Sequence, residues 1–280
     1  MFHQALMQAG ITPPHKIVVD GHIHRFQTEG DPGNKNGWYV LFDDPLAGAF
    51  GCWKAGISEK WSSKALTDEE WIKVKARIEE AKKRRMEEEA ERQAECRRKA
   101  EWLWQKAKPA DQNNAYLTRK GVLPYGVKES RGSLLVPVRG QDGTLRGLQF
   151  IRPDGSKKFM SGTQKKGSYF AIPGNMVRLY VAEGYATAAT IRQATGCAVA
   201  VAFDAGNLIE VGRELRAKLP DVPLVFCADN DKHGVGQQKA AAAAKACSGI
   251  VCLSPEVGTD FNDLAAKYGR DHVTKILVAA

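Results

Sequence analysis

The chain lacks several features that would place it in a common class of protein. None of the apolar runs in its 280 residues approaches the length of a membrane span. Residues 1–10 have neither the basic region nor the long apolar region of a signal peptide. The six cysteines are scattered and form no C-x-x-C pair, so no disulfide framework or strong zinc motif is visible. We therefore expect a protein of the reducing cytoplasm with no membrane partner.

Several catalytic motifs are also missing. There is no phosphate loop of the form G-x-x-x-x-G-K followed by Ser or Thr, which excludes an ATP-driven helicase within this sequence. No Ser-His-Asp arrangement is discernible. Gly184 has no companion glycines of the kind that mark a dinucleotide site. Zinc is not expected either: His22, His24 and Cys52 lack a strong zinc spacing.

Positive charge is present and is concentrated in one segment. The formal net charge of the chain is +9. Residues 119–178 hold twelve Lys or Arg but only three acidic residues, so this block accounts for the excess. Concentration of this kind is typical of a surface that binds a polyanion such as nucleic acid. The alternative is a basic surface that serves solubility alone.

The first two segments have different compositions. Residues 1–62 contain short apolar and aromatic runs at 17–20, 21–26, 37–42 and 49–53, separated by Asp, Gly, Pro and Asn turns, which predicts a small β domain. Its aromatic residues are expected mainly in the core, with stacking on single-stranded bases as the alternative. Residues 63–108 are rich in Glu, Lys, Arg and Ala after a Thr67/Glu70 capping box, which predicts a long charged helical linker rather than a coiled coil.

The second half of the chain predicts two further parts. Residues 109–176 contain a short helix at 113–120 closed by Gly121, and a hairpin of 133–138 with 145–151, which gives a basic α+β subdomain. From 177 to 280, short apolar runs alternate with helical segments. This predicts an α/β fold with a parallel sheet, right-handed crossovers and helices on both faces.

The strands of this last domain end on acidic residues. The run 178–182 stops at Glu183, and the run 222–228 stops at Asp229 and Asp231. Side chains at the carboxyl ends of parallel strands gather at one edge of the sheet. Carboxylates brought together repel one another unless a cation lies between them, and carboxylate oxygens favour Mg²⁺ or Mn²⁺. A site for phosphoryl chemistry is therefore predicted, although Glu183 alone has the ordinary alternative of a helix first-turn acid.

These motifs together resemble the TOPRIM domain shared by DnaG-type primases, topoisomerases and some nucleases. Glu183-Gly184 after one strand and Asp229-x-Asp231 after another carry the resemblance, and the segment Thr259–Leu264 is similar to a late acidic segment of the primases. Upstream, Tyr116-Leu117, Leu135–Val138 and Lys158–Ser161 are similar to successive pieces of the primase catalytic core. The similarity covers roughly residues 113–268 and favours the plasmid, phage or integrative-element primases.

The chain departs from this pattern at several points. Thr187 stands where the family usually has an aspartate, and Asp204 at another predicted strand end is a possible substitute. Lys232 and the residues after it differ from the Gly and Ala that usually follow the acidic pair. Residues 20–56 resemble the zinc ribbon of bacterial primases in length but lack its cysteines.

The resemblance implies a set of roles. Glu183, Asp229 and Asp231 would be the catalytic and metal-binding residues for Mg²⁺ or Mn²⁺, with Asp204, Asp260 and Asp263 as accessory acids. Contacts to nucleotide or nucleic acid would come from a basic group: Lys157, Lys158, Lys165, Lys166, Arg146, Arg152 and Lys232. Lys158 is expected beside the metal site.

The implied function is a DNA primase that copies single-stranded DNA into short RNA primers from nucleoside triphosphates, beside a separate replicative helicase. The first domain would contact the template. Two alternatives remain open: a TOPRIM nuclease that uses the same metals, and a single-stranded-DNA-binding module whose catalysis has decayed. Thr187 is the feature that favours the second alternative.

Overall fold

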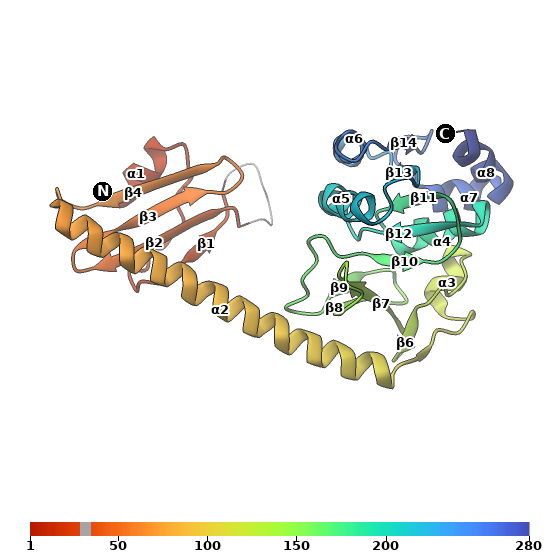
Figure 1. Cartoon of the computed structure of the whole chain (residues 1–280), viewed down its shortest axis with the longest axis horizontal. Helices are drawn as coiled ribbons and strands as arrows, with labels where there is room; N and C mark the ends of the chain where they lie inside the picture. Colours follow the sequence, from red (N-terminus) through yellow and green to blue (C-terminus); the bar gives the residue numbers. More distant parts are fainter. Residues whose placement is uncertain (29–34, 280) are drawn as a thin grey trace. The chain divides into compact units, whose positions relative to one another are not determined.

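The computed structural model describes residues 1–28 and 35–279, and the chain forms two compact units, Met1–Glu91 and Arg92–Ala280 (Figure 1). The boundary falls inside one long helix, α2 (Asp68–Lys106). The four-part division expected from the sequence is finer than these two units and stays a prediction. Among the described residues, no helix is both long enough and apolar enough to cross a bilayer.

The first unit is built on an antiparallel sheet. Its strands are β1 (His24–Phe26), β2 (Gly37–Asp43), β3 (Leu46–Cys52) and β4 (Ile57–Ser62), in that order across the sheet. Alternate residues of β2 face opposite sides. Tyr39 and Leu41 pack with helix α1 (Phe2–Gln8), whereas Trp38 and Val40 pack with the first turns of α2. The predicted β domain is confirmed in its fold class.

Several details of the first unit differ from the prediction. Residues 17–20 form no strand, because this run lies outside the sheet and Val18 N–H donates to the Tyr39 hydroxyl instead of a neighbouring strand. Strand β4 was missed, since Ser58, Glu59 and Lys60 on this edge strand are polar and exposed. Helix α1 has no side-chain cap to announce it. The predicted turn at residues 29–34 lies outside the described residues.

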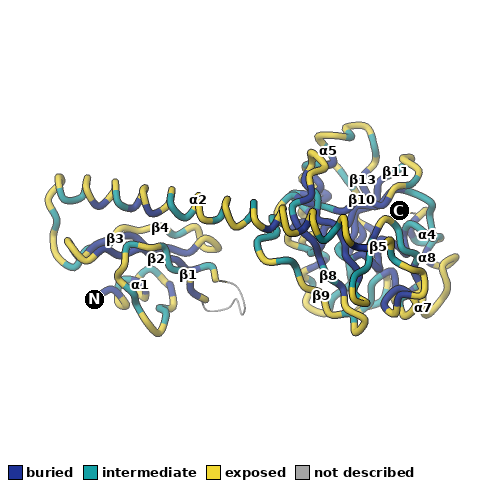
Figure 2. Tube along the Cα trace, turned by 90° about the horizontal axis from the view of Figure 1, so that it is seen from below, coloured by how far each residue is buried: buried dark blue, intermediate teal, exposed yellow. Residues whose placement is uncertain are grey.

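Helix α2 begins where the capping box places it. Thr67 Oγ1 accepts from Glu70 N–H at 3.2 Å, and Glu70 Oε2 accepts from Thr67 N–H at 2.8 Å. Its few apolar residues pack in two separate groups, one with each unit. Val74 and Ile78 pack on the sheet of the first unit, and Ala100 and Leu103 pack against β7 and β8 of the second. Exposed residues recur along the rest of the helix (Figure 2).

The basic segment forms a second antiparallel sheet. It consists of β5 (Lys108–Pro109), β6 (Lys128–Ser130), β7 (Ser133–Arg139), β8 (Leu145–Ile151) and β9 (Lys157–Phe159). Helix α3 (Ala115–Lys120) is capped by Asn114 and ends at Gly121 in the left-handed conformation. The predicted hairpin and short helix are thus confirmed, and β5 and β6 are additions to them.

The third sheet is the parallel one predicted for the C-terminal part. Its order is β10-β12-β11-β13-β14, formed by β10 (Phe170–Ile172), β11 (Asn175–Ala182), β12 (Cys197–Val201), β13 (Leu224–Ala228) and β14 (Ile250–Leu253). All neighbouring pairs are parallel except β10 with β12, an edge pairing that the sequence did not reveal.

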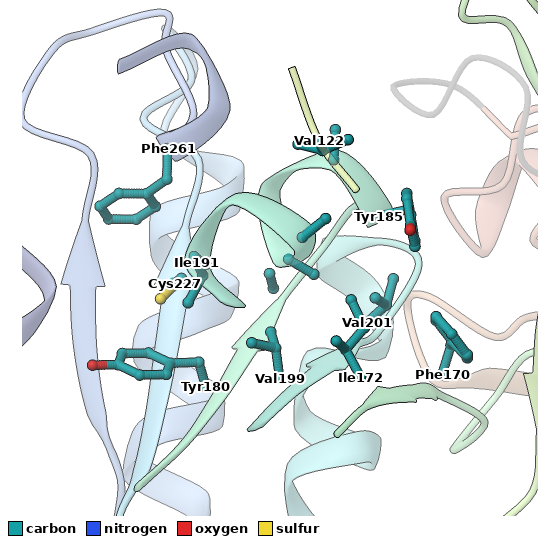
Figure 3. Packing of buried hydrophobic residues seen from close by; sticks show 14 of the residues in the cluster. Val122, Phe170, Ile172, Tyr180, Tyr185, Ile191, Val199, Val201, Cys227 and Phe261 are labelled. Atoms are coloured by element: carbon teal, nitrogen blue, oxygen red, sulfur yellow. The ribbon is translucent and has the colours of Figure 1, made fainter. Parts of the chain in front are cut away.

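Helices cover both faces of this sheet. Leu179 and Val181 of β11 pack with α5 (Leu208–Lys218) and α6 (Val235–Ala246). Tyr180 and Ala182 face the other way, toward α4 (Tyr185–Thr195), α7 (Phe261–Tyr268) and α8 (Arg270–Ala279). Figure 3 shows Tyr180, Val199 and Cys227 on this second face, with Ile191 and Phe261 from the covering helices. Because both faces are buried, the strands are apolar throughout rather than alternating.

One buried amide fixes the loop that precedes β10. Asn207, in the short 3₁₀ turn η1 (Ala205–Asn207), is 4% exposed. Its Nδ2 donates to the carbonyls of Ala202 at 2.9 Å, Ser168 at 2.9 Å and Lys165 at 3.1 Å, and its Oδ1 accepts from Gly167 N–H at 2.8 Å. A single side chain therefore ties residues 165–168 to the end of β12.

We expect Asn207→Ala to lower the free energy of unfolding by about 2–4 kcal/mol, because buried carbonyl groups lose their donors. Urea unfolding followed by circular dichroism measures this change. Asn175→Ala, at an exposed position, is the matched control and should stay within about 0.5 kcal/mol of the parent. A loss below about 1 kcal/mol for Asn207→Ala would contradict the assigned role.

Candidate active site

Two carboxylates from distant parts of the sequence meet at the carboxyl edge of the parallel sheet. Strands β11 and β13 are hydrogen-bonded neighbours, with Ala182 opposite Cys227. Glu183 follows the last residue of β11, and Asp229 follows the last residue of β13. The pairing register therefore brings the two acids to the same edge, as the sequence predicted.

Both acids hold a buried oxygen without a partner. Glu183 Oε1 and Asp229 Oδ1 are inaccessible to solvent and make no hydrogen bond. Burial and then the negative charges of Asp229, Asp204 and Asp231 raise the pKa of Glu183 to about 7. Burial and then the charge of Asp260 raise the pKa of Asp229 to about 6, while Lys157 acts in the opposite direction. Burial and nearby negative charges thus disfavour the ionised form of both carboxyl groups.

Gly236 lies where these acids converge. A Cβ atom at this position would lie 3.0 Å from Asp231 Oδ2, 3.1 Å from the Asp229 carbonyl oxygen and 3.3 Å from Glu183 Oε1. A larger residue would press on all three groups. The sequence analysis missed Gly236; the signal for it was a glycine in the first turn of a helix that follows an acidic strand end.

Asp231 differs from its two neighbours. Its Oδ1 accepts from His233 N–H at 2.9 Å and Val235 N–H at 3.2 Å, and its Oδ2 accepts from Gly236 N–H at 2.7 Å. These backbone bonds, led by the one from Gly236, lower the pKa of Asp231. Strand β13 ends at Ala228 and Asp231 lies in the turn before α6, so the two aspartates do not lie on one strand.

The accessory acids surround this pair. Asp204 caps η1 through Asn207 N–H and forms an ion pair with Lys165. Asp260 caps α7, accepting from the backbone N–H groups of Asn262 at 2.7 Å and Asp263 at 2.8 Å. Asp263 forms an ion pair with Lys120 at 3.6 Å.

Thr187 is part of this arrangement. Its hydroxyl donates to Asp260 Oδ2 at 3.0 Å, and the residue is 3% exposed. A hydroxyl at this position therefore satisfies a neighbouring carboxylate, where an aspartate would add another negative charge to a cluster that is already repulsive. The departure from the family pattern is compatible with an intact acidic site.

The basic residues divide between two faces of the basic sheet. Burial raises the pKa of Asp229, and the positive charge of Lys157 opposes that rise. The Lys157 Nζ would lie 3.4 Å from a Cβ atom placed on Gly184. Phe159, two residues on, packs against Phe203 with ring centroids 5.7 Å apart. Lys158 faces the opposite way and lines a cleft with Arg152. Lys157, rather than Lys158, is therefore the lysine beside the acids, because strand residues alternate.

The remaining predicted contacts have other neighbours. Arg146 covers Gly140, close enough that a Cβ there would meet its guanidinium. Lys166 forms an ion pair with Glu210 at 3.6 Å. Lys232 is exposed and lies near Gly258.

The donor set can be tested against a divalent cation. No group of three or more His, Cys, Asp or Glu side chains within residues 1–28 and 35–279 is arranged as a ready-made metal cage. Mg²⁺, however, is commonly held by only one or two carboxylates together with substrate phosphate and water. Glu183 and Asp229 each hold a buried carboxylate oxygen without a donor, and burial followed by nearby negative charges raises the pKa of both groups, which fits that mode of binding.

The raised pKa of Glu183 predicts how stability depends on pH. Because the pKa in the folded protein exceeds that of an unfolded carboxyl, the folded state loses stability as the pH rises toward about 7. Glu183→Gln removes this loss. In EDTA at pH 8 the variant should be more stable than the parent by about 1–3 kcal/mol, and the gain should shrink between pH 7 and pH 5.

Urea unfolding at a series of pH values measures this effect. Glu256→Gln is the control of opposite sign, because hydrogen bonds from Tyr268 and then Lys267 lower the pKa of Glu256. That variant should gain nothing at pH 8. A Glu183→Gln protein that is no more stable than the parent at pH 8 would show that burial and the neighbouring carboxylates do not destabilise the ionised Glu183 side chain.

Comparison with known proteins shows which domain family and which proteins the chain resembles. Residues 178–271 match the Toprim domain family. Two Escherichia coli proteins named DNA primase TraC are 35% identical over 271 residues and 34% identical over 272 residues. Each match covers 89% of this chain but only 25% and 19% of the relatives, so the chain spans about a quarter or a fifth of their length.

A solved structure described as the DnaG primase catalytic domain bound to ssDNA overlaps in part. It is 13% identical, the match covers 68% of this chain and 80% of that one, and the TM-score is 0.49. The parallel sheet that carries Glu183 and Asp229 lies within the matched Toprim segment, and the similarity to TraC extends over most of the chain. Residues 178–271 therefore match the Toprim domain family, and most of the chain is similar to a part of each DNA primase TraC protein.

Proposed function

We propose that this chain is a priming module that synthesises short RNA primers on single-stranded DNA by metal-dependent nucleotidyl transfer. The observation that carries the proposal is the pair of buried, unpartnered carboxylate oxygens of Glu183 and Asp229 within a chain related to DNA primases. A carboxylate oxygen with no donor of its own is suited to hold a cation against the phosphates of a nucleotide.

The acidic residues would act together. Glu183 and Asp229 would hold Mg²⁺ or Mn²⁺ through their free oxygens, and Asp231 would contribute a lone pair not used by the backbone of α6. The bound ion would supply charge neutralisation at the triphosphate and activation of the attacking 3′-hydroxyl. Asp260, held by Thr187, shapes the potential at Asp229 and is well placed to act as an accessory acid.

The basic residues would receive the substrates. Lys157, next to Asp229, would contact the phosphates of the incoming nucleoside triphosphate. On the other face of the sheet, a cleft of 520 Å³ would receive template. Its walls include Lys106, Arg131, Arg152 and Lys158, together with Trp102, which is 63% exposed. Cations interleaved with an exposed aromatic ring suit single-stranded nucleic acid.

Template contact and strand separation are the remaining steps of the proposed function. The first unit would contact template, with its aromatic residues held mostly in the core. Strand separation would come from a separate replicative helicase, since the sequence has no phosphate loop.

The purified chain, incubated with single-stranded DNA, labelled ribonucleotides and Mg²⁺ or Mn²⁺, should produce elongated RNA. Asp229→Asn and Glu183→Gln should each lower the yield by about 100-fold or more, because they remove charge that the transition state requires. Glu210→Gln, an acid of α5 paired with Lys166 and Arg213, is the matched control and should retain full synthesis.

The same assay distinguishes the alternative functions. Shortened DNA that depends on Asp229 would identify a nuclease. Retention of DNA without any product, in both metals, would identify a binding module and overturn the polymerase proposal. Primer synthesis that persists in Asp229→Asn would place the chemistry elsewhere.

Consecutive lysines on β9 allow a second test. Lys157→Ala should raise the KM for ribonucleotides by about tenfold, because it removes a charge from the phosphate-binding edge. Lys158→Ala should leave that KM unchanged and weaken binding of single-stranded DNA, measured by fluorescence anisotropy. The reverse pattern would exchange the two assignments.

A further inference from the structure

A second cleft lies away from the carboxyl edge of the parallel sheet, within the unit Arg92–Ala280. It has a volume of 670 Å³ and is lined by residues of α3 and by residues of α4, α7 and the start of α8. This volume is typical of a site for a small organic ligand. None of the acidic residues discussed above lines it.

The charges that line the cleft are all positive. Arg119, Lys120 and Arg270 contribute to its wall, and no Asp or Glu does. Lys120 forms an ion pair with Asp263 at 3.6 Å, and the Arg119 guanidinium donates a hydrogen bond to the Pro153 carbonyl. Arg270 forms no ion pair with any carboxylate among the described residues, and it begins α8, whose N-terminal N–H groups add partial positive charge. The cleft therefore favours an anion.

The uncharged lining adds a second kind of contact. Leu117, Val122 and Ala265 give an apolar surface, and Gln112, Asn113 and Gln193 bring amide groups to the same cleft. Gln193 already accepts from Leu123 N–H at 3.3 Å through its Oε1. An apolar surface with amides suits a heterocyclic base, and the cations suit phosphate. Inorganic anions would leave most of this lining without a partner.

The cleft is connected to the acidic site by one buried residue. Asn262, 3% exposed, lines the cleft and donates through Nδ2 to the Lys120 carbonyl at 2.8 Å and to Thr190 Oγ1 at 2.9 Å. Its own backbone N–H is capped by Asp260 Oδ1 at 2.7 Å. A ligand that packs against α3 and α7 thus contacts a residue whose cap faces Asp229.

We propose that this cleft is a nucleoside-phosphate site separate from the acidic site. The base would lie on the apolar and amide-bearing wall between α3 and α4, and the phosphates would lie toward Arg270. The proposal does not rest on the priming activity, because it requires neither the acidic pair nor a divalent cation. With two nucleotide sites on one chain, nucleotide bound in the cleft would influence the acidic site through α7.

Binding of labelled ATP in EDTA, measured by equilibrium dialysis, tests the proposal. Removal of divalent cations excludes metal-held triphosphate at Glu183 and Asp229. ATP should bind the parent, and Arg270→Ala should weaken binding by about tenfold, which corresponds to one lost charge-assisted contact. Ala266→Trp, which fills the cleft without removing a charge, should abolish binding.

Two control variants locate the site. Lys267→Ala removes a cation of α7 that is paired with Glu256 outside the cleft, and it should bind ATP like the parent. Asp229→Asn should also retain binding. Circular dichroism confirms that each variant is folded.

Three results would overturn the proposal. The first is unchanged binding in both Arg270→Ala and Ala266→Trp. The second is loss of binding in Asp229→Asn, which would move the nucleotide to the acidic site. The third is inorganic tripolyphosphate competing as well as ATP, which would reduce the cleft to a site for anions that does not recognise the base.

Discussion

Burial of several carboxylates at one edge of the parallel sheet sets the electrostatics of the acidic site. The parallel pairing of β11 and β13 places Glu183 and Asp229 at one edge, and neither acid has a donor for its buried oxygen. The other acids of the site have partners of their own. Asp231 accepts hydrogen bonds from the backbone at the start of α6, Asp204 pairs with Lys165, and Asp260 accepts from Thr187 and from the start of α7. Glu183 Oε1 and Asp229 Oδ1 remain without a hydrogen-bond donor.

The two faces of the basic sheet carry lysines toward different surroundings. One face carries Lys157 toward the acids, and the other carries Lys158 and Arg152 into an open cleft. A strand needs only two consecutive lysines to serve both, because its side chains alternate. The concentration of positive charge in residues 119–178 is therefore divided among separate surfaces, and the cleft beside α3 receives a further share.

Helix α2 shows how few apolar residues a long helix needs when it serves two units. Val74 and Ile78 belong to one core, whereas Ala100 and Leu103 belong to another, and the turns between them are largely polar. Each unit thus has its own core on its own part of the helix. The four-part organisation inferred from composition stays a prediction, and packing assigns the ends of the helix to the neighbouring sheets.

The sequence by itself determined the alternation of the C-terminal elements and the acids that follow β11 and β13, because fully buried strands and capped helices leave strong local patterns. Polar β4, uncapped α1 and the antiparallel edge β10 left no such pattern, since their formation depends on partners distant in sequence. Only the tertiary structure decided that Asp231 caps a helix, that Thr187 supports Asp260 and that Lys157 rather than Lys158 lies beside Asp229. These outcomes depend on where a strand stops and which face it presents, and a change of one residue in either reverses the direction of a side chain.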